Sequence, residues 1–171
     1  MKRKFFIMLT LMFATLGTWA APPQQPEKSE AEKFVQSLAK IKSDEISYAY
    51  ISANMFKQLF VKVDLNENES KALSFIKSLK SLRRFFTDGK QGYDTMKAAL
   101  QPFLLESDEV MGMTLMASNR DGGGMVAIYS GQGNTLVVTD YGNNETITLV
   151  FVAGLSYESF LEFNDLGINF F

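Results

Sequence analysis

Apolar positions in the first half of the chain recur mainly with the period of a helix. The first such run consists of Phe34, Val35, Leu38 and Ile41. Ser29 and Glu32 precede it with the spacing of a capping box, in which the two side chains satisfy free backbone N–H groups at a helix start. Residues 46–51 (ISYAYI) then break the helical period with β-branched and aromatic residues, which predict a strand.

The same alternation of helix and strand continues to about residue 105. Ser52 predicts the cap of a following helix, and a further helix from Ser70 precedes a short strand over residues 82–87. A longer helix is expected over residues 93–105, where Pro102 predicts a kink or an early end.

In the second half of the chain the period of the apolar positions changes from 3.6 to 2. Strands are expected over residues 109–117, 125–130, 135–141 and 145–155, with a short helix over 156–164. The segments NRDGGG, GQGN and GNN separate the strands as turns. The predicted fold is therefore α+β: an N-terminal alternation of helices and strands, then a four-stranded antiparallel meander, with the helices packed on one sheet face.

Gly122, Gly123 and Gly124 form the most enzyme-like stretch, because glycine-rich loops can cradle a phosphate. A phosphate loop leads from a strand into a helix, whose N-terminal N–H groups face the anion. After Gly124 the sequence MVAIYS continues as a strand, and the Lys-Ser/Thr pair of a P-loop is missing. The triplet is predicted to be a hairpin turn.

The first residues have the order of a secretory signal peptide. Lys2, Arg3 and Lys4 precede an apolar run, and Ala20 ends a group of small residues. We expect a signal peptide over 1–20 with cleavage near Ala20, a flexible linker over 21–30 and a single α+β domain over 31–171. The exported product is expected in the periplasm or outside the cell, soluble and with no stable membrane anchor.

Charge argues against a nucleic-acid partner. Without Lys2, Arg3 and Lys4, fourteen basic residues stand against nineteen acidic ones, a net charge of −5, whereas nucleic-acid-binding domains carry a basic excess. A local basic stretch is formed by Lys71, Lys77, Lys80, Arg83 and Arg84. It is open to two interpretations, an anion-binding stripe or a solvated face.

The composition excludes several chemistries. The chain has no histidine and no cysteine, which rules out Ser-His-Asp and Cys-His catalysis, imidazole or thiolate zinc sites, and lipidation of a cysteine. Carboxylate chemistry remains, with two candidate groups: Asp44 with Glu45, and Glu106 with Asp108 and Glu109. Both groups stand where solvated charge is common, so we predict no catalytic, cofactor or metal residues and a protein that is not an enzyme.

Two short motifs have alternative interpretations. The segment DLNENES from Asp64 alternates oxygen-bearing side chains, yet it lacks the central glycine and the twelfth-position glutamate of a calcium loop. Asp94-Thr95-Met96 fits a short bacterial O-glycosylation sequon, and Thr95 can equally be an ordinary residue near a helix start. Both are expected to be structural by default.

The order of the segments resembles the DUF4252 family of secreted bacterial proteins, which has no assigned function. The resemblance rests on ISYAYISANMFKQLF, SLKSLRRFFTDG, MVAIYSGQGNTLVV and ITLVFVAGLSYESF. It implies an α+β domain exported beyond the inner membrane of Gram-negative bacteria, and it supplies no catalytic residues.

Two classes of function are expected from the sequence. The first is a non-enzymatic binding or structural module that contacts a protein or an envelope component through the uncovered face of the meander or an exposed edge strand. The alternative is a carboxylate-dependent hydrolase that acts on cell-envelope polymers. An exposed aromatic patch on the sheet would favour the binding module.

Overall fold

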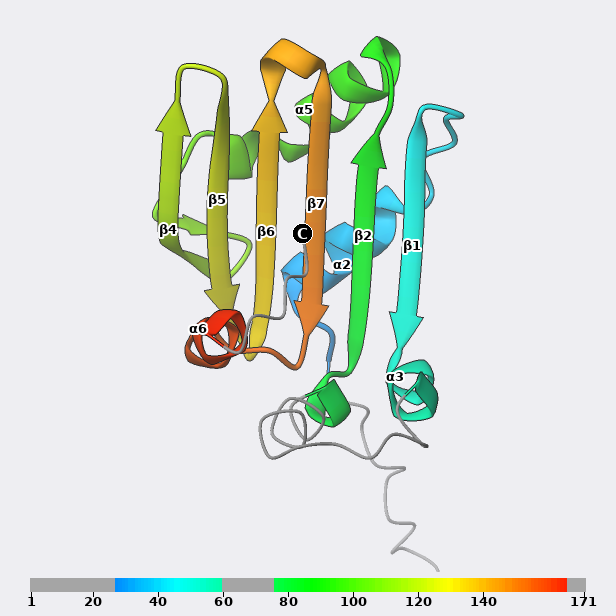
Figure 1. Cartoon of the computed structure of the whole chain (residues 1–171), viewed down its shortest axis with the longest axis vertical. Helices are drawn as coiled ribbons and strands as arrows, with labels where there is room; N and C mark the ends of the chain where they lie inside the picture. Colours follow the sequence, from blue (N-terminus) through cyan, green and yellow to red (C-terminus); the bar gives the residue numbers. More distant parts are fainter. Residues whose placement is uncertain (1–26, 60–75, 166–171) are drawn as a thin grey trace, which may run out of the picture.

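A seven-stranded sheet forms the centre of the computed structural model, which describes residues 27–59 and 76–165 (Figure 1). Its order is β1-β2-β7-β6-β5-β4-β3, and every neighbouring pair is antiparallel. The strands are β1 (Ile46–Ser52), β2 (Ser81–Thr87), β3 (Glu109–Val110), β4 (Met113–Asp121), β5 (Gly124–Gly131), β6 (Asn134–Tyr141) and β7 (Thr146–Ala153). The predicted α+β class is confirmed, whereas the predicted four-stranded meander understates the sheet.

The sheet is larger than predicted because the two early strands join the meander. β2 pairs with β7, with Ser81 opposite Ala153 and Phe86 opposite Thr148. β1 then pairs with β2 along its whole length. Hydrophobic periodicity predicts each strand locally, but it carries no information about which distant strand becomes a neighbour.

One predicted strand, residues 109–117, is two strands in the structure. β3 and β4 form a tight hairpin around Met111 and Gly112, whose φ angles are 53° and 70°. Two consecutive left-handed residues are the backbone of a type I′ turn. The prediction was wrong here because Met111 is a residue type that rarely adopts positive φ, so the sequence carries no ordinary hairpin signal.

Two helices cover one face of the sheet. α2 (Glu30–Leu38) and α5 (Lys90–Leu104) both lie behind the strands in Figure 1. They bury Val35, Met96 and Phe103 against sheet residues such as Phe85 and Tyr129. The Tyr129 hydroxyl donates to the backbone oxygen of Phe103 at 2.9 Å, which ties the end of α5 to β5. Pro102 lies inside the last turn of α5, and the helix continues past it to Leu104 rather than ending early.

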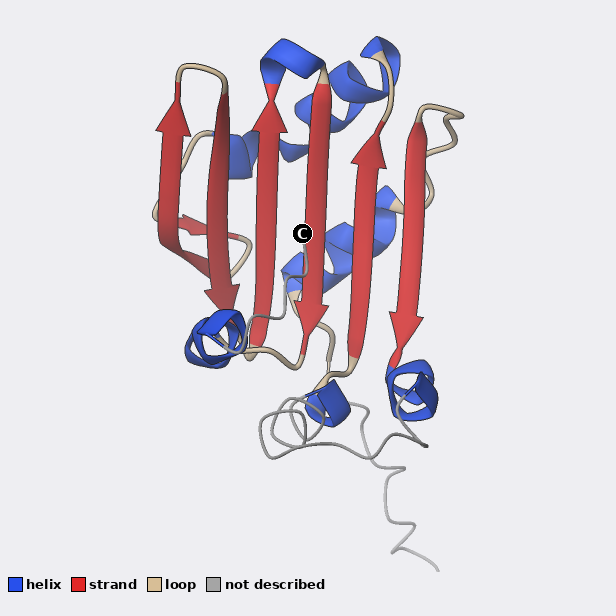
Figure 2. Ribbon diagram, viewed as in Figure 1, coloured by secondary structure: helices blue, strands red, loops and turns tan. Residues whose placement is uncertain are grey.

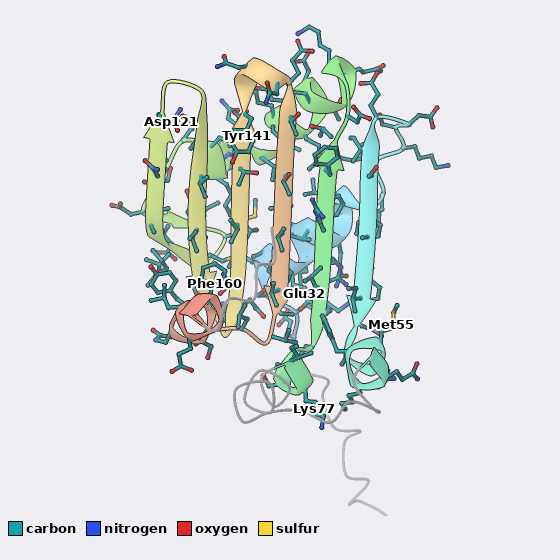
Figure 3. The ribbon with its side chains drawn as sticks, viewed as in Figure 1. Glu32, Met55, Lys77, Asp121, Tyr141 and Phe160 are labelled. Carbon is teal, nitrogen blue, oxygen red and sulfur yellow. The ribbon has the colours of Figure 1, made fainter. Side chains whose placement is uncertain are left out.

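The helices are not confined to that face, which corrects the prediction. α6 (Tyr157–Asp165) lies in front of the sheet in Figure 2, and Phe160 packs with Val137 and Val150 on the opposite face. α3 (Ala53–Leu59) follows β1 directly, and Phe56 belongs to the same second apolar cluster. The face opposite α2 and α5 is therefore covered at one end, where Figure 3 labels Phe160.

The serine caps and the glycine turn predicted from the sequence are confirmed. Ser29 Oγ accepts a hydrogen bond from the backbone N–H of Glu32 at 3.1 Å, and Ser52 Oγ accepts one from Met55 at 3.3 Å. The Glu32 carboxylate, predicted as the other half of a capping box, instead accepts from Gln36 Nε2 at 3.0 Å. At the glycine triplet, Asp121 Oδ1 accepts from the N–H groups of Gly123 and Gly124, both at 2.9 Å. β4 and β5 thus meet in the predicted hairpin, where Figure 3 labels Asp121.

Several predictions fall on residues that the structure does not describe. These are the signal peptide, most of the linker, the Asp64 loop and the start of the helix from Ser70. Within residues 27–59 and 76–165, none of the helices combines the length and apolar character needed to span a membrane.

Candidate functional site

The first candidate carboxylate group lies at the start of α5. Glu45 Oε2 accepts a hydrogen bond from the backbone N–H of Gly92 at 2.7 Å. A Cβ atom on Gly92 would lie 2.6 Å from the Glu45 backbone oxygen, so only glycine allows this approach. Asp44 is exposed in the turn beside it. Glu45 therefore serves to anchor the first turn of α5 to the strand that begins at Ile46.

The second candidate group lies near the opposite edge of the sheet. Glu106 Oε2 accepts from Arg120 Nη2 at 2.9 Å, and the hydrogen bond from Ser118 together with Arg120 lowers the Glu106 pKa. Asp108 and Glu109 are exposed at β3, which is six strand positions away from β1. At about 4.8 Å per strand the two groups are separated by more than 20 Å, so carboxylates from both groups cannot flank one glycosidic bond, and either group would have to supply the pair by itself.

A polar groove lies between α5 and strands β4 to β6. It has a volume of about 530 Å³ and is lined by Asp94, Lys97, Ala98, Gln101, Leu104, Leu105, Arg120, Met125 and Asp140. Two of its lining residues bond to Tyr93: the Tyr93 hydroxyl donates to Asp140 Oδ1 at 3.0 Å, and Lys97 Nζ donates to the Tyr93 oxygen at 2.6 Å. Lys97 Nζ also lies 3.4 Å from Asp140 Oδ2.

The charges of this groove are already paired within the chain. Lys97 faces Asp140, and Arg120 faces Glu106 while also donating to the backbone oxygen of Leu104 at 3.1 Å. The hydrogen bond to Tyr93 raises the Lys97 pKa, so Lys97 and Glu106 both remain charged at neutral pH. A general acid of the glycosidase type needs a carboxyl group with a raised pKa, and Glu106 is shifted in the other direction.

Acidic side chains do not gather into a metal site in the described part of the chain. No group of three or more lies close enough to hold an ion within residues 27–59 and 76–165. Thr95 is exposed on α5, and its hydroxyl donates to the backbone oxygen of Gln91 at 2.7 Å. This local bond is the ordinary behaviour of a threonine in a helix.

The basic stretch does not form a single surface. Arg83 and Arg84 are neighbours on β2, so their side chains point to opposite faces of the sheet. Arg83 is 8% exposed and lies 3.9 Å from Glu32 of α2, whereas Arg84 is exposed on the other face. Lys77 and Lys80 are exposed before β2, and Lys71 lies outside the described residues. The interpretation as one continuous anion-binding stripe is therefore not supported by the geometry of β2.

The most unusual surface is the edge strand β1. Residues 47–50 are exposed on both faces of the strand, and Tyr48 and Tyr50 each keep 44% of their surface exposed. β1 pairs with β2 on one side and has no strand on its other side among the described residues. Figure 1 shows it as the outermost strand at the right of the sheet. The strand carries no charged residue and no proline, and its pairing with β2 is regular over seven residue pairs.

The direction of the free backbone groups follows from the register of β1 and β2. In an antiparallel pair, opposite residues alternate between those that exchange backbone hydrogen bonds and those that do not. The Asp88 N–H donates to the Glu45 backbone oxygen at 2.8 Å, so Glu45 and Asp88 form a hydrogen-bonded pair. The next pair along the strands, Ile46 opposite Thr87, is therefore one that exchanges no hydrogen bonds. Ser47, Ala49 and Ile51 therefore direct their N–H and C=O groups to β2. The same groups of Tyr48, Tyr50 and Ser52 point away from the sheet, whereas the outward N–H of Ile46 already donates to the backbone oxygen of Ser43 at 3.3 Å.

Side chains of β2 pack against both tyrosines on the face of the sheet that α2 covers. The Tyr48 ring lies 4.7 Å from the Phe85 ring, and the Arg83 guanidinium lies 4.8 Å from the centre of the Tyr50 ring. On the other face, β1 and β2 border a shallow hollow of about 300 Å³ lined by Ser47, Tyr48, Ala49, Arg84 and Phe86. Both faces of the open edge therefore expose apolar surface.

The opposite edge of the sheet is protected. β3 has only two residues, β4 has a register shift between Leu115 and Ala117, and its far end carries Arg120 and Asp121. Short edge strands, bulges and charges are the usual devices against edge-to-edge pairing. Since β1 has none of them, the two edges differ in their capacity to accept another strand.

Comparison with known proteins places the chain in a family. The family model described as "Domain of unknown function (DUF4252)" matches residues 34–156. The chain belongs to this family. The match confirms the resemblance found in the sequence and extends from α2 past the end of β7, so it includes both the open edge and the polar groove. Neither the curated proteins nor the solved structures contain a match.

Sequence reasoning predicted a strand at residues 46–51 but assigned no functional weight to it. The open edge had been expected in the meander, whereas the meander's outer edge is the protected one and β1 is the open one. A signal was present, because ISYAYIS is a strand of high β-propensity without charges. The sequence does not indicate the order of the strands in the sheet, and it is this order that places β1 at an edge.

Proposed function

We propose that this DUF4252 protein is a non-enzymatic binding module that recognises an extended peptide segment by adding it as a strand along β1. The observation that carries the proposal is the combination of outward-directed backbone groups and exposed rings at Tyr48 and Tyr50. In strand addition, main-chain hydrogen bonds supply affinity and alternate side chains supply specificity.

The partner segment that fits best is uncharged and alternates large and small side chains. Side chains on the α2 face would contact Tyr48 and Tyr50, and those on the other face would reach the hollow beside Ala49 and Phe86. Arg84 borders that hollow and is exposed, so a single acidic or polar side chain there is compatible. We further propose that the protein acts after export, for which the N-terminal signal-like segment is the support.

The alternative hydrolase is disfavoured by the positions of its carboxylates. Glu45 is engaged with the start of α5, and Glu106 is engaged with Arg120. The two groups lie near opposite edges of the sheet. No observation in the described part of the chain favours catalysis over binding.

A test of strand addition exploits the outward direction of the Tyr50 N–H. Tyr50→Pro removes this donor without removing a bond to β2, and proline is tolerated in an edge strand when its N position faces outward. Tyr50→Val removes the ring and keeps the donor. Extended peptides selected from a displayed heptapeptide library on the purified protein should bind Tyr50→Val within about tenfold of the unchanged protein.

The same peptides should lose binding to Tyr50→Pro, while the melting temperatures of the two variants stay close. Selected peptides that bind Tyr50→Pro as well as they bind Tyr50→Val would contradict strand addition. A library that yields no binder at all would contradict it too.

A further inference from the structure

The centre of β1 is symmetric about Ala49, which Tyr48 and Tyr50 flank, whereas the next positions, Ser47 and Ile51, differ. If two copies of β1 lie antiparallel with Ala49 opposite Ala49, each Tyr48 stands opposite a Tyr50. The Tyr-Ala-Tyr centre of the strand is therefore complementary to itself.

The backbone supports this same register. Tyr48 and Tyr50 both direct their N–H and C=O groups outward, as argued from the bond between Asp88 and Glu45. With Ala49 on the two-fold axis, Tyr48 of each copy meets Tyr50 of the other, and these outward groups exchange hydrogen bonds on both sides of the axis. A shift by one residue would place outward groups opposite inward ones. The alternation therefore allows the symmetric register and excludes its immediate neighbours.

Opposite charges come near one another in the same arrangement. Asp44 and Asp88 are exposed at the beginning of β1, together with Lys42, and the α3 helix at its end carries Lys57 and no acidic residue. Antiparallel pairing brings Asp44 and Asp88 of one copy to the end of β1 where the other carries Lys57, twice by symmetry. The seven paired residues carry no charge, so like charges are not placed opposite one another.

From these observations we infer that the open edge of β1 binds a second copy of the same chain, joining two seven-stranded sheets into one continuous sheet. The inference rests on the proposed function and names the partner of the same site. Tyr48 and Tyr50, each 44% exposed, would bury on the order of 300–400 Å² over the two copies. Because a stable interface buries about 1,200–2,000 Å², the dimer should be weak and dependent on concentration.

Absence of cysteine from the chain makes cross-linking a clean test. Ala49 is exposed and would face Ala49 of the second copy in a pair that exchanges no hydrogen bonds, where Cα atoms lie about 4.5 Å apart. This separation is within the range of a disulfide. Ser47 is exposed on the same face as Ala49. In the proposed dimer, however, the Ser47 residues of the two copies would be four residues, or about 13 Å, apart along the strand.

Ala49→Cys should therefore form a covalent dimer under oxidised glutathione about tenfold or more faster than the matched Ser47→Cys. Sedimentation of the unchanged protein should show a monomer–dimer equilibrium. Equal rates for the two cysteine variants, or a monomer at all concentrations, would overturn the inference.

If the protein is monomeric yet selected peptides still distinguish Tyr50→Val from Tyr50→Pro, the second copy is the wrong partner and strand addition stands. If peptides also fail to bind, both proposals fall.

Discussion

The guanidinium of Arg83 lies between the Tyr50 ring, 4.8 Å from its centre, and the Glu32 carboxylate, 3.9 Å away. Arg83 also donates to Ser81 Oγ at 3.4 Å. A nearly buried cation thus links the open edge strand to α2 on the covered face. The contact packs the ring of Tyr50 against Arg83 of β2, at the edge where a partner strand would meet it.

Loss of the Glu32 charge should destabilise the fold. Glu32→Gln leaves Arg83 without its anionic partner at 8% exposure, and we expect a loss of about 1–2 kcal/mol in the free energy of unfolding, measured by urea denaturation. The matched control is Glu30→Gln on the same helix, where the side chain is exposed and the expected change is below about 0.5 kcal/mol. Equal effects of the two substitutions would show that Arg83 does not depend on Glu32.

The hydroxyl of Thr87 should be needed for the junction of β2 and β7. Thr87 Oγ1 accepts a hydrogen bond from the buried N–H of Ile147 at 2.8 Å. Thr87→Val keeps the shape and removes the acceptor, so the expected cost is about 1–3 kcal/mol. Thr148→Val, on the half-buried side of β7, should change stability by less than about 0.5 kcal/mol. Chemical denaturation of both variants compares them directly, and a neutral Thr87→Val would contradict the assigned bond.

Glycines of the meander should differ sharply in their tolerance of a side chain. A Cβ atom on Gly131 would overlap the backbone oxygen of Gly112 and lie 2.9 Å from the Met113 Cα, whereas one on Gly122 meets nothing within 4 Å. We expect Gly131→Ala to cost about 2 kcal/mol or more and Gly122→Ala to be nearly neutral. Thermal melting resolves the difference, since about 1 kcal/mol corresponds to roughly 2–4 °C for a chain of this size. A strongly destabilising Gly122→Ala would contradict the hairpin at the glycine triplet.

Acid should weaken the contact between Glu106 and Arg120. The folded-state pKa of Glu106 is lowered by the hydrogen bond from Ser118 and then by Arg120. A lowered carboxyl pKa means that the stabilisation is present above the unfolded-state pKa and is lost as the pH falls through the folded-state value. Melting temperatures between pH 7 and about pH 3 should fall less steeply for Glu106→Gln than for the unchanged protein. Parallel curves would show that this group does not contribute.

Local structure was predictable because its causes are local. Ser29 and Ser52 cap helices as expected, and the Asp121 side chain closes the predicted hairpin through Gly123 and Gly124. The change of period from 3.6 to 2 correctly separated the helical half from the meander. Each of these signals depends only on residues within a few positions of one another.

The rest depended on contacts between distant segments. The pairing of β2 with β7 is the reason that the sheet has seven strands, and no periodicity in residues 82–87 indicates that neighbour. The turn at Met111 and Gly112 requires positive φ at a methionine, which tertiary packing imposes against its local preference. Similarly, Glu45 appeared to be a free carboxylate in the sequence and proved to be bonded to Gly92, 47 residues away.

The most direct test of strand addition at β1 is amide hydrogen exchange at single-residue resolution as a function of protein concentration. The N–H groups of Ser47 and Ala49 face β2 and should be protected at every concentration. Those of Tyr48 and Tyr50 should exchange rapidly in dilute protein and become protected at high concentration or with a selected peptide. Exchange at Tyr48 and Tyr50 that stays the same under all these conditions would contradict the account.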